Sequence, residues 1–272
     1  MILLIASEKD VASVNIANKL LKNYDFEKTS DIFDENPIYV LKLQNREIRL
    51  VYTKKDLIYT QNITDYFRPE LIIYISRHSS ASGKPTLSVH TPGNLTEDAS
   101  YGGLPKKVSV SPANAMRSAL REMERLRLEW NLKYAVCYEC THHGPSLDVP
   151  TMFVELGSSL MQWKDLRAAE AVAHAAIKAA TSKEECMTVL GIGGPHYNEK
   201  FTKMALTEEV AFGHIIPKHM VGRVDVEVLR QCIERTLERV ELAVLDWKGI
   251  KGADKQPLIE KLENLGLEIR KV

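Results

Sequence analysis

Residues 134–157 constrain the fold and function of this 272-residue chain more than any other stretch. Residues 134–138 are a short apolar run of the kind that forms a buried strand, and residues 151–156 are a second one. The side chains in this stretch that can move protons or bind a metal are Glu139, Cys140, Thr141, His142, His143 and Glu155. Open α/β sheets bind their ligands at the carboxyl ends of buried strands, so the stretch predicts a functional site directly after its first strand.

The composition is that of a globular protein, with 44% hydrophobic and 26% charged residues. No apolar run reaches the roughly 18 residues that a membrane span needs, and the first ten residues are typical of a first strand, not of a signal peptide. Acidic and basic residues are equal in number, at 36 each, which argues against nucleic-acid binding through bulk charge. Cys137 and Cys140 form a single CxxC, which excludes a zinc site built from two such pairs. Nothing suggests a disulfide framework, and we expect a cytoplasmic protein.

Short buried strands alternate with helices along the chain. Besides the two runs above, strands are predicted at residues 2–6, 38–43, 48–53, 71–76, 86–90, 186–190, 241–245 and 267–270. Helices are predicted at residues 9–21 with Ser7 as the cap, 111–130 with Ser111 as the cap, 163–180, 225–240 and 255–265. This alternation predicts an α/β fold with a mixed, mostly parallel sheet and flanking helices. We expect residues 1–272 to form one compact unit, and a division into two lobes, 1–77 and 78–272, is an open alternative.

Seven of the eight histidines fall at predicted strand ends or in loops: His78, His90, His142, His143, His196, His214 and His219. Only His174 lies inside a predicted helix, where we expect a structural role. Each loop histidine alone could be an ordinary polar residue, but strand ends of an α/β sheet converge on one crevice. A metal site would need His142 or His143 together with another histidine or a carboxylate, because adjacent residues on an extended backbone point in opposite directions.

Two further loops could contact a ligand. The first has small residues, backbone donors and cations suited to an anionic group, and the glycines of the second let the backbone approach a ligand closely. The first follows the strand at 71–76 and contains Arg77, His78, Ser79, Ser80, Ser82 and Lys84. It is not a phosphate-binding Walker loop, because the first glycine is missing and Pro85 replaces the magnesium-binding hydroxyl residue. The second, residues 191–197, contains Gly193, Gly194 and His196, without the spacing of a dinucleotide fingerprint.

Arg117, Arg121 and Arg125 are spaced four residues apart on the predicted helix that follows Ser111, and therefore form one stripe. Lys106 and Lys107 precede that helix. The stripe could follow a phosphate backbone, or it could be a solvated face that carries acidic residues as well.

Four blocks follow one another along the chain: residues 76–94 (SRHSSASGKPTLSVHTPGN), 139–159 (ECTHHGPSLDVPTMFVELGSS), 191–197 (GIGGPHY) and 212–219 (FGHIIPKH). Together with Trp163, these blocks resemble the archaeal and plant type of D-aminoacyl-tRNA deacylase. The resemblance implies a fold related to nucleoside phosphorylases and peptidyl-tRNA hydrolases, and a dependence on zinc. It also implies hydrolysis of the ester between a D-amino acid and the terminal ribose of tRNA.

Hydrolysis of an aminoacyl ester needs an activated water, a stabiliser for the oxyanion and a pocket for the amino group. We hypothesise that His142, or a zinc that it helps to hold, activates the water, with Thr141 and His143 beside it. The amides near Gly144 or in the Gly193–Gly194 loop would stabilise the oxyanion, and Glu139 or Glu155 would receive the ammonium. The loop from Arg77 to Lys84 would bind the terminal phosphate. The candidate zinc ligands are His90, His142, His196 and His214. Catalysis assisted by the ribose hydroxyl is an open alternative.

Two other functions stay open at this point. Fold kinship alone would allow a hydrolase or phosphorylase that acts on another nucleoside or on peptidyl-tRNA. A non-catalytic RNA-binding module would use the histidines to stack on bases or pair with them. The enzyme is favoured because proton-transfer residues outnumber aromatic residues in the candidate loops. The partner we expect is the acceptor end of tRNA, with neither DNA nor a membrane, and we favour a monomer.

Overall fold

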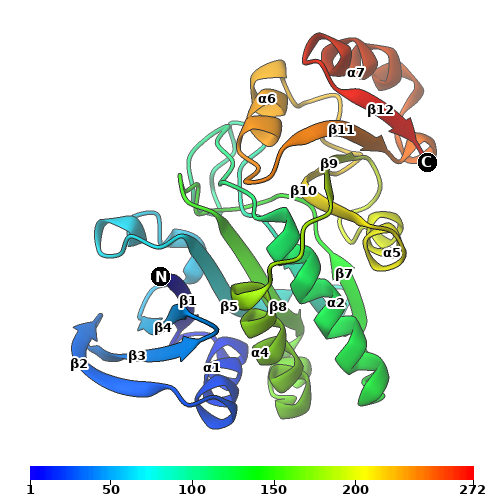
Figure 1. Ribbon diagram of the computed structural model, residues 1–272. Coiled ribbons are helices and arrows are strands. Elements are labelled where there is room, and N and C mark those ends of the chain that lie inside the picture. Colours follow the sequence, from blue (N-terminus) through cyan, green and yellow to red (C-terminus); the bar gives the residue numbers. More distant parts are fainter.

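The computed structural model describes residues 1–272, and its strands form two sheets (Figure 1). The larger sheet has the strand order β2-β3-β4-β1-β5-β8-β6-β7. Its strands are β1 (Ile2–Ser7), β2 (Glu27–Phe33), β3 (Asn36–Leu43), β4 (Arg46–Thr53), β5 (Leu71–Ser79), β6 (Thr86–His90), β7 (Ala135–Tyr138) and β8 (Thr151–Ser158). The smaller sheet has the order β10-β9-β11-β12, formed by β9 (Met187–Ile192), β10 (Val210–Ile216), β11 (Val240–Leu245) and β12 (Glu268–Lys271).

Parallel pairings dominate both sheets. In the larger sheet β1 pairs in parallel with β4 and β5, β5 with β8, and β6 with β7. The pairings of β2 with β3, β3 with β4 and β6 with β8 are antiparallel. All pairings in the smaller sheet are parallel. The predicted α/β fold with a mixed, mostly parallel sheet is confirmed.

The larger sheet has one face covered by helices and one covered by loops. On the helix-covered face, α1 (Val11–Asn23), α2 (Ala113–Glu129) and α4 (Leu166–Thr181) pack side by side (Figure 1). Leu4, Ile73 and Val154 of the strands meet Ala171 and Ala175 of α4 in this core. The small alanine side chains let the backbone of α4 lie close to its neighbours, and the strand residues in this core are apolar.

The loop-covered face changes character along its strands. Side chains alternate between the two faces of a strand. Ile5, Tyr74 and Phe153 form an apolar core with residues of the covering loops. Two residues beyond Tyr74 and Phe153, towards the carboxyl ends of β5 and β8, the same face presents Ser76 and Glu155, which are paired in register. A polar cluster therefore lies at the edge of an apolar core.

The smaller sheet packs with α6 (Val226–Glu234) and α7 (Gly252–Asn264) around its own core of 17 buried residues. The segment after α6 joins this part to the larger sheet. The Arg235 guanidinium donates to the carbonyls of Val108 (2.7 Å) and Leu147 (2.8 Å), in the loops that cover the larger sheet. The Glu238 carboxylate accepts hydrogen bonds from the first amides of α2, at 3.0 and 2.9 Å.

Two predicted helix caps are wrong. The amino end of α1 is capped by Asp10, whose carboxylate accepts the Ser13 amide, and the Ser7 hydroxyl instead donates to the carbonyl of Lys55. Ser111 does not cap α2; its hydroxyl accepts from Thr91, and Glu238 takes the helix amides.

Other differences concern element lengths and elements that the prediction missed. The helix expected at 225–240 ends at Glu234. The elements that were not predicted are β2, α5 (Glu199–Thr207), β10 and the short α3 (Leu160–Trp163). The strands divide into two sheets between β8 and β9, and residues on both sides of position 77 share the larger sheet. None of the helices has the length and apolar sequence that a membrane-crossing helix requires.

Candidate active site

A cavity of about 770 Å³ opens on the loop-covered face, over the carboxyl ends of β1 and β5. Its walls include the histidines His78, His142, His143, His196 and His219, which come from separate segments of the chain. Glu155 lines the same cavity, and His90 lies beside it with its ring stacked on Phe153 at a centroid distance of 5.0 Å. The structure thus brings six of the seven loop histidines to one place.

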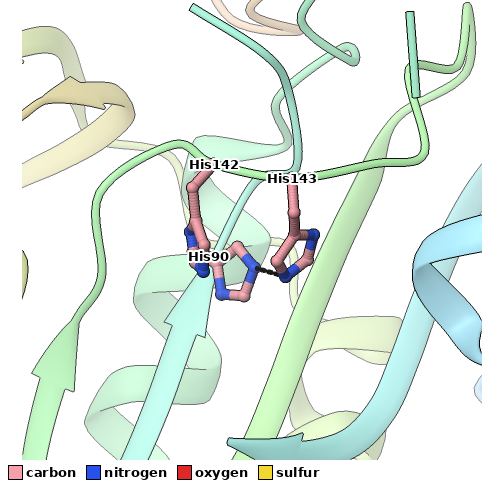
Figure 2. A group of neighbouring side chains, drawn as sticks. All are labelled: His90, His142 and His143. Atoms are coloured by element: carbon pink, nitrogen blue, oxygen red, sulfur yellow. Dashed lines mark hydrogen bonds between the residues drawn. The ribbon is translucent and has the colours of Figure 1, made fainter. Parts of the chain in front are cut away.

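His90, His142 and His143 form a cluster that we call the histidine trio (Figure 2). The Nδ1 atoms of His142 and His143 lie 2.7 Å from the carbonyl oxygens of Cys140 and Gly144. A carbonyl oxygen can only accept, so both Nδ1 atoms carry the hydrogen and both Nε2 atoms present a lone pair. The Nε2 atoms of His90 and His143 are 3.2 Å apart, as the dashed line in Figure 2 shows.

The protein holds the histidine trio in its neutral form. Burial, reinforced by neighbouring histidines, lowers the pKa of His90 and His142 well below the usual value. Burial lowers the pKa of His143 to about 4, against the opposing effect of its bond to Gly144. Neutral imidazoles with free nitrogens are the form that binds divalent metals.

The geometry of the histidine trio fits a metal such as zinc. The candidate ligand atoms lie within 4.8 Å of one another, and Nδ1 of His90 is buried without a hydrogen-bond partner. Two nitrogens bound to one tetrahedral zinc lie roughly 3.3 Å apart, close to the separation of the His90 and His143 Nε2 atoms. Three histidines would leave a fourth position for water or substrate. The bonds from Nδ1 to carbonyls are the outer contacts that orient metal-binding histidines.

The backbone at His143 supports this geometry. His143 has φ +43°, in the left-handed region that is uncommon for residues other than glycine. The next residue must be glycine, since a Cβ on Gly144 would lie 2.1 Å from the amide nitrogen of Gly103. Such strain persists only where surrounding contacts enforce it, and it concentrates at functional sites.

A second polar group lies beside the trio and centres on Glu139. Its Oε2 is 2.8 Å from Nε2 of His196 and 3.8 Å from Nε2 of His142, and its Oε1 is 3.0 Å from Nδ1 of His78. Burial alone would raise the pKa of Glu139, but the hydrogen bonds to His196 and His78 outweigh it and hold that pKa well below its usual range. Glu139 is therefore ionised, and as an acceptor it fixes the hydrogen of His196 on Nε2.

His78 lies between two carboxylates, with Nδ1 3.0 Å from Glu139 and 3.4 Å from Glu155. Burial would lower the pKa of His78, yet these carboxylates raise it to about 11, so the ring is an imidazolium. Its Nε2 donates to the hydroxyl of Tyr197. Burial raises the pKa of Glu155 to about 7, and its Oε1 accepts a hydrogen bond of 2.6 Å from Ser76.

Sequence reasoning missed three of these residues: Ser76, Phe153 and Tyr197. All three lie inside or next to segments that were singled out, and the alternation along β5 and β8 puts Ser76 and Phe153 on the same face as His78 and Glu155. That alternation was the sequence signal that could have identified Ser76 and Phe153.

Other predicted site residues lie elsewhere or are already bonded. His214 is fully buried outside the cavity, where its ring bonds to the Thr141 hydroxyl and the Arg235 carbonyl. The amides of Gly144 and Gly193 donate to the carbonyls of Tyr101 and Ile216, so neither is free for an oxyanion. Gly194 lies against the Asp246 carboxylate. Arg77 and Ser79 line the cavity, whereas Ser80, Ser82 and Lys84 do not, and Lys84 pairs with Glu199.

The arginine stripe of α2 is engaged within the protein. The buried guanidinium of Arg117 donates to the carbonyls of Ala205 and Glu208. Arg121 pairs with Glu184, and Arg125 pairs with Glu122 and Glu129. Of the lysines before the helix, Lys106 pairs with Glu97 and Asp225, and Lys107 pairs with Asp148.

Comparison with known proteins gives consistent results. A family model described as D-aminoacyl-tRNA deacylase matches residues 65–270. A D-aminoacyl-tRNA deacylase of Thermococcus kodakarensis is 39% identical, and the match covers 98% of both chains. One from Pyrococcus furiosus is 37% identical over the full length of both. Among solved structures, a conserved protein of unknown function, AF0625, has a TM-score of 0.88 and 31% identity, over 100% of this chain and 95% of that one. A Campylobacter jejuni 5'-methylthioadenosine/S-adenosyl homocysteine nucleosidase covers 66% of this chain, but its TM-score of 0.43 and identity of 13% are too low to support an inference.

Proposed function

The chain belongs to the D-aminoacyl-tRNA deacylase family, and from that membership we propose where and how it acts. It hydrolyses the ester bond of D-aminoacyl-tRNA and releases free tRNA and the D-amino acid. We place this reaction in the cavity beside the histidine trio. The observation that carries the proposal is the trio itself, whose three neutral imidazoles lie next to the Glu139–His196 pair. Family membership sets aside the alternative nucleoside or peptidyl-tRNA substrates and the non-catalytic RNA-binding module.

We assign a zinc ion to the histidine trio, because its donor set and tautomers fit one. When bound, zinc would supply positive charge beside the ester carbonyl, where negative charge develops during hydrolysis. The protein holds the Nε2 lone pairs of His142 and His143 in place through the carbonyls of Cys140 and Gly144, and it positions the His90 ring by stacking it on Phe153.

The proton of the attacking water goes to His196 in this proposal. Glu139 accepts the hydrogen of His196 Nε2, which leaves Nδ1 as the basic atom of a ring that is 38% exposed. A carboxylate that orients a histidine in this way selects the tautomer that works as a general base. His142 keeps its Nε2 lone pair for the trio. Of the oxyanion donors proposed from the sequence, the amides of Gly144 and Gly193 are occupied, which leaves the amide of Gly194 and the side chains of the cavity for that role.

The substrate ammonium binds to Glu155. Of the two candidate carboxylates, only Glu155 lines the cavity, whereas the Glu139 side chain is fully buried and bonded to histidines. A cation next to Glu155 would stabilise its ionised form and gain a charge-assisted hydrogen bond. We also propose a monomer that works in the cytoplasm on charged tRNA.

The test is hydrolysis of matched D- and L-tyrosyl-tRNA, with and without a strong chelator, followed by zinc addition. Selective cleavage of the D-ester that is lost with chelator and restored by zinc is the expected result. Selective cleavage that ignores the chelator would remove zinc from the mechanism and leave the histidines or the ribose hydroxyl. Near-normal turnover by both His142→Ala and His143→Ala would contradict the histidine-centred mechanism altogether.

A further inference from the structure

The cavity wall contains a single lysine or arginine, and that residue stacks on a tryptophan outside the cavity. The residue is Arg77, whose guanidinium carbon lies 5.3 Å from the ring centroid of Trp163 in α3. The indole nitrogen of Trp163 donates to the carbonyl of His78 at 2.9 Å. Trp163 is thereby anchored directly to the residue that joins the two catalytic carboxylates.

The surface around Trp163 is both cationic and apolar. Lys164 and Arg167 are exposed, and Leu160 and Met161 are 50% and 75% exposed. We call these residues, with Arg77 and Trp163, the Trp163 shelf. None of its three cations forms a salt bridge, in contrast to Arg125, which has two carboxylate partners. Arg77 stacks on Trp163, and Arg167 stacks on Trp130 with its guanidinium carbon 5.7 Å from the ring centroid. Cations without carboxylate partners keep their charge available to an anionic ligand.

The rest of the cavity wall is acidic. It includes the carboxylates of Asp56 and Asp98 as well as Asp10, which accepts the backbone amide of Arg77 at 2.7 Å. Arg77 is therefore the one lysine or arginine of the wall that attracts a polyanion entering the cavity.

We propose that the Trp163 shelf binds the unpaired 3′ end of the tRNA, with a base against the stacked Arg77 and Trp163 side chains and phosphates beside Arg77, Lys164 and Arg167. The inference rests on the proposed function, which places the ester in the cavity. Single-stranded nucleic acid is bound by aromatic stacking together with a cationic track, and stacking tolerates any base. The amino acid then occupies the part of the cavity beside Glu155.

The experiment compares D-tyrosyl-tRNA with D-tyrosyl-adenosine, which has the ester but none of the preceding nucleotides. We expect Lys164→Ala/Arg167→Ala to raise KM for the tRNA substrate about tenfold, with kcat unchanged and D-tyrosyl-adenosine cleaved as by the wild type. The slope of log(kcat/KM) against log salt should become shallower by about 0.7 for each cation removed. Trp163→Ala should raise KM for the tRNA, and Trp163→Phe, which keeps an aromatic ring, should recover most of the loss.

Two double variants on other cationic surfaces serve as controls for the Trp163 shelf. Arg121→Ala/Arg125→Ala removes the paired cations of α2, and Lys218→Ala/Arg223→Ala removes exposed cations near His219; both should leave KM for tRNA unchanged. A rise in KM with either pair, and none with the shelf variants, overturns the proposal. If the wild type cleaves neither substrate, the proposed function fails. If it cleaves both and the shelf variants match it on tRNA, only this inference fails.

Discussion

The two faces of the larger sheet share the same strands, yet only one of them carries chemistry. On the helix-covered face, apolar strand residues meet α4, where Ala168, Ala171 and Ala175 are fully buried. On the loop-covered face, β5 and β8 change from Tyr74 and Phe153 to Ser76 and Glu155 within two residues. Helices form the hydrogen bonds of their own backbone groups, so they can cover a sheet face by apolar packing alone. The backbone groups of loops need other hydrogen-bond partners, and on this face the loops leave a cavity with polar walls.

The comparison is sharpest between two histidines. His143 belongs to the loop-covered face, and His174 lies on α4 with its Nδ1 bonded to the Tyr24 hydroxyl at 2.7 Å. We expect His143→Ala to lower the rate of D-tyrosyl-tRNA hydrolysis about a thousandfold, because it removes a member of the histidine trio. His174→Ala, the same change on the other face, should retain most of the rate. Steady-state kinetics measure the rates of both variants, and circular dichroism checks that each is folded. Equal losses of rate in the two variants would contradict the distinction between the faces.

The next largest effect concerns substrate binding on the loop-covered face. Glu155→Gln removes the negative charge that the ammonium meets while keeping the shape of the side chain and an acceptor for Ser76. A charge-assisted hydrogen bond contributes about 1.5–3 kcal/mol, so KM should rise roughly thirtyfold with a smaller change in kcat. N-acetylated D-tyrosyl-tRNA, which lacks the ammonium, serves as the control. If Glu155→Gln slows that substrate as much as the free amine, the ammonium is bound elsewhere.

The helix-covered face should respond to a change in volume with a loss of stability. Ala175→Leu inserts a larger side chain where α4 packs on its neighbours, and overpacking of a dense core costs about 1–3 kcal/mol. Denaturant unfolding should show this loss, while activity per folded molecule at low temperature stays close to the wild type. Lys178→Ala, on the exposed side of the same helix, should change stability by less than about 0.5 kcal/mol. Loss of activity without loss of stability in Ala175→Leu would contradict the separation of the faces.

The smallest effect concerns a histidine that is buried outside the cavity. Burial lowers the pKa of His214 to about 4, whereas an unfolded histidine has a pKa of about 6.5. Between these values the unfolded chain binds a proton that the folded chain does not, so stability falls as the pH drops. From about pH 7 to about pH 5, the wild type should lose about 2 kcal/mol more unfolding free energy than His214→Gln. Urea unfolding of the two proteins at each pH measures this difference in unfolding free energy. If the unfolding free energies of both proteins depend on pH in the same way, the pKa of His214 is not lowered by folding.

The sequence was informative where local patterns decide the structure. Apolar runs located ten of the strands, and histidines at strand ends indicated one site because carboxyl ends of neighbouring strands lie together. It was uninformative where partners are distant in the chain. Glu238 caps α2 from 124 residues away, and no local pattern distinguishes that from the expected cap by Ser111. The same holds for the arginine stripe: spacing gave its geometry, but the carbonyls that bind Arg117 come from a segment about 90 residues later.

The candidate site could be predicted as a set of residues, but not as an arrangement. The candidate zinc ligands predicted from the sequence were His90, His142, His196 and His214. In the structure, His90 and His142 lie with His143 in a group that could hold a metal ion, His196 lies with Glu139 and His142 in a second such group, and His214 lies apart. Which histidines face one another depends on the left-handed backbone of His143 and on the carbonyls that fix each ring. Those contacts form only once the loops are folded over the sheet.

The contacts of Arg235 and Glu238 also determine when this enzyme becomes complete during its own synthesis. The loops at Val108 and Leu147 and the first turn of α2 leave the ribosome well before the residues that anchor them. Domains fold as their segments emerge, but a contact between distant segments forms only after the later one has been made. A nascent chain that ends before Arg235 has all eight strands of the larger sheet and all the residues of the histidine trio, and still lacks the anchors of the loops around them. The contacts of Arg235 and Glu238 that hold the loops over the sheet can therefore form only after more than four fifths of the chain has been translated.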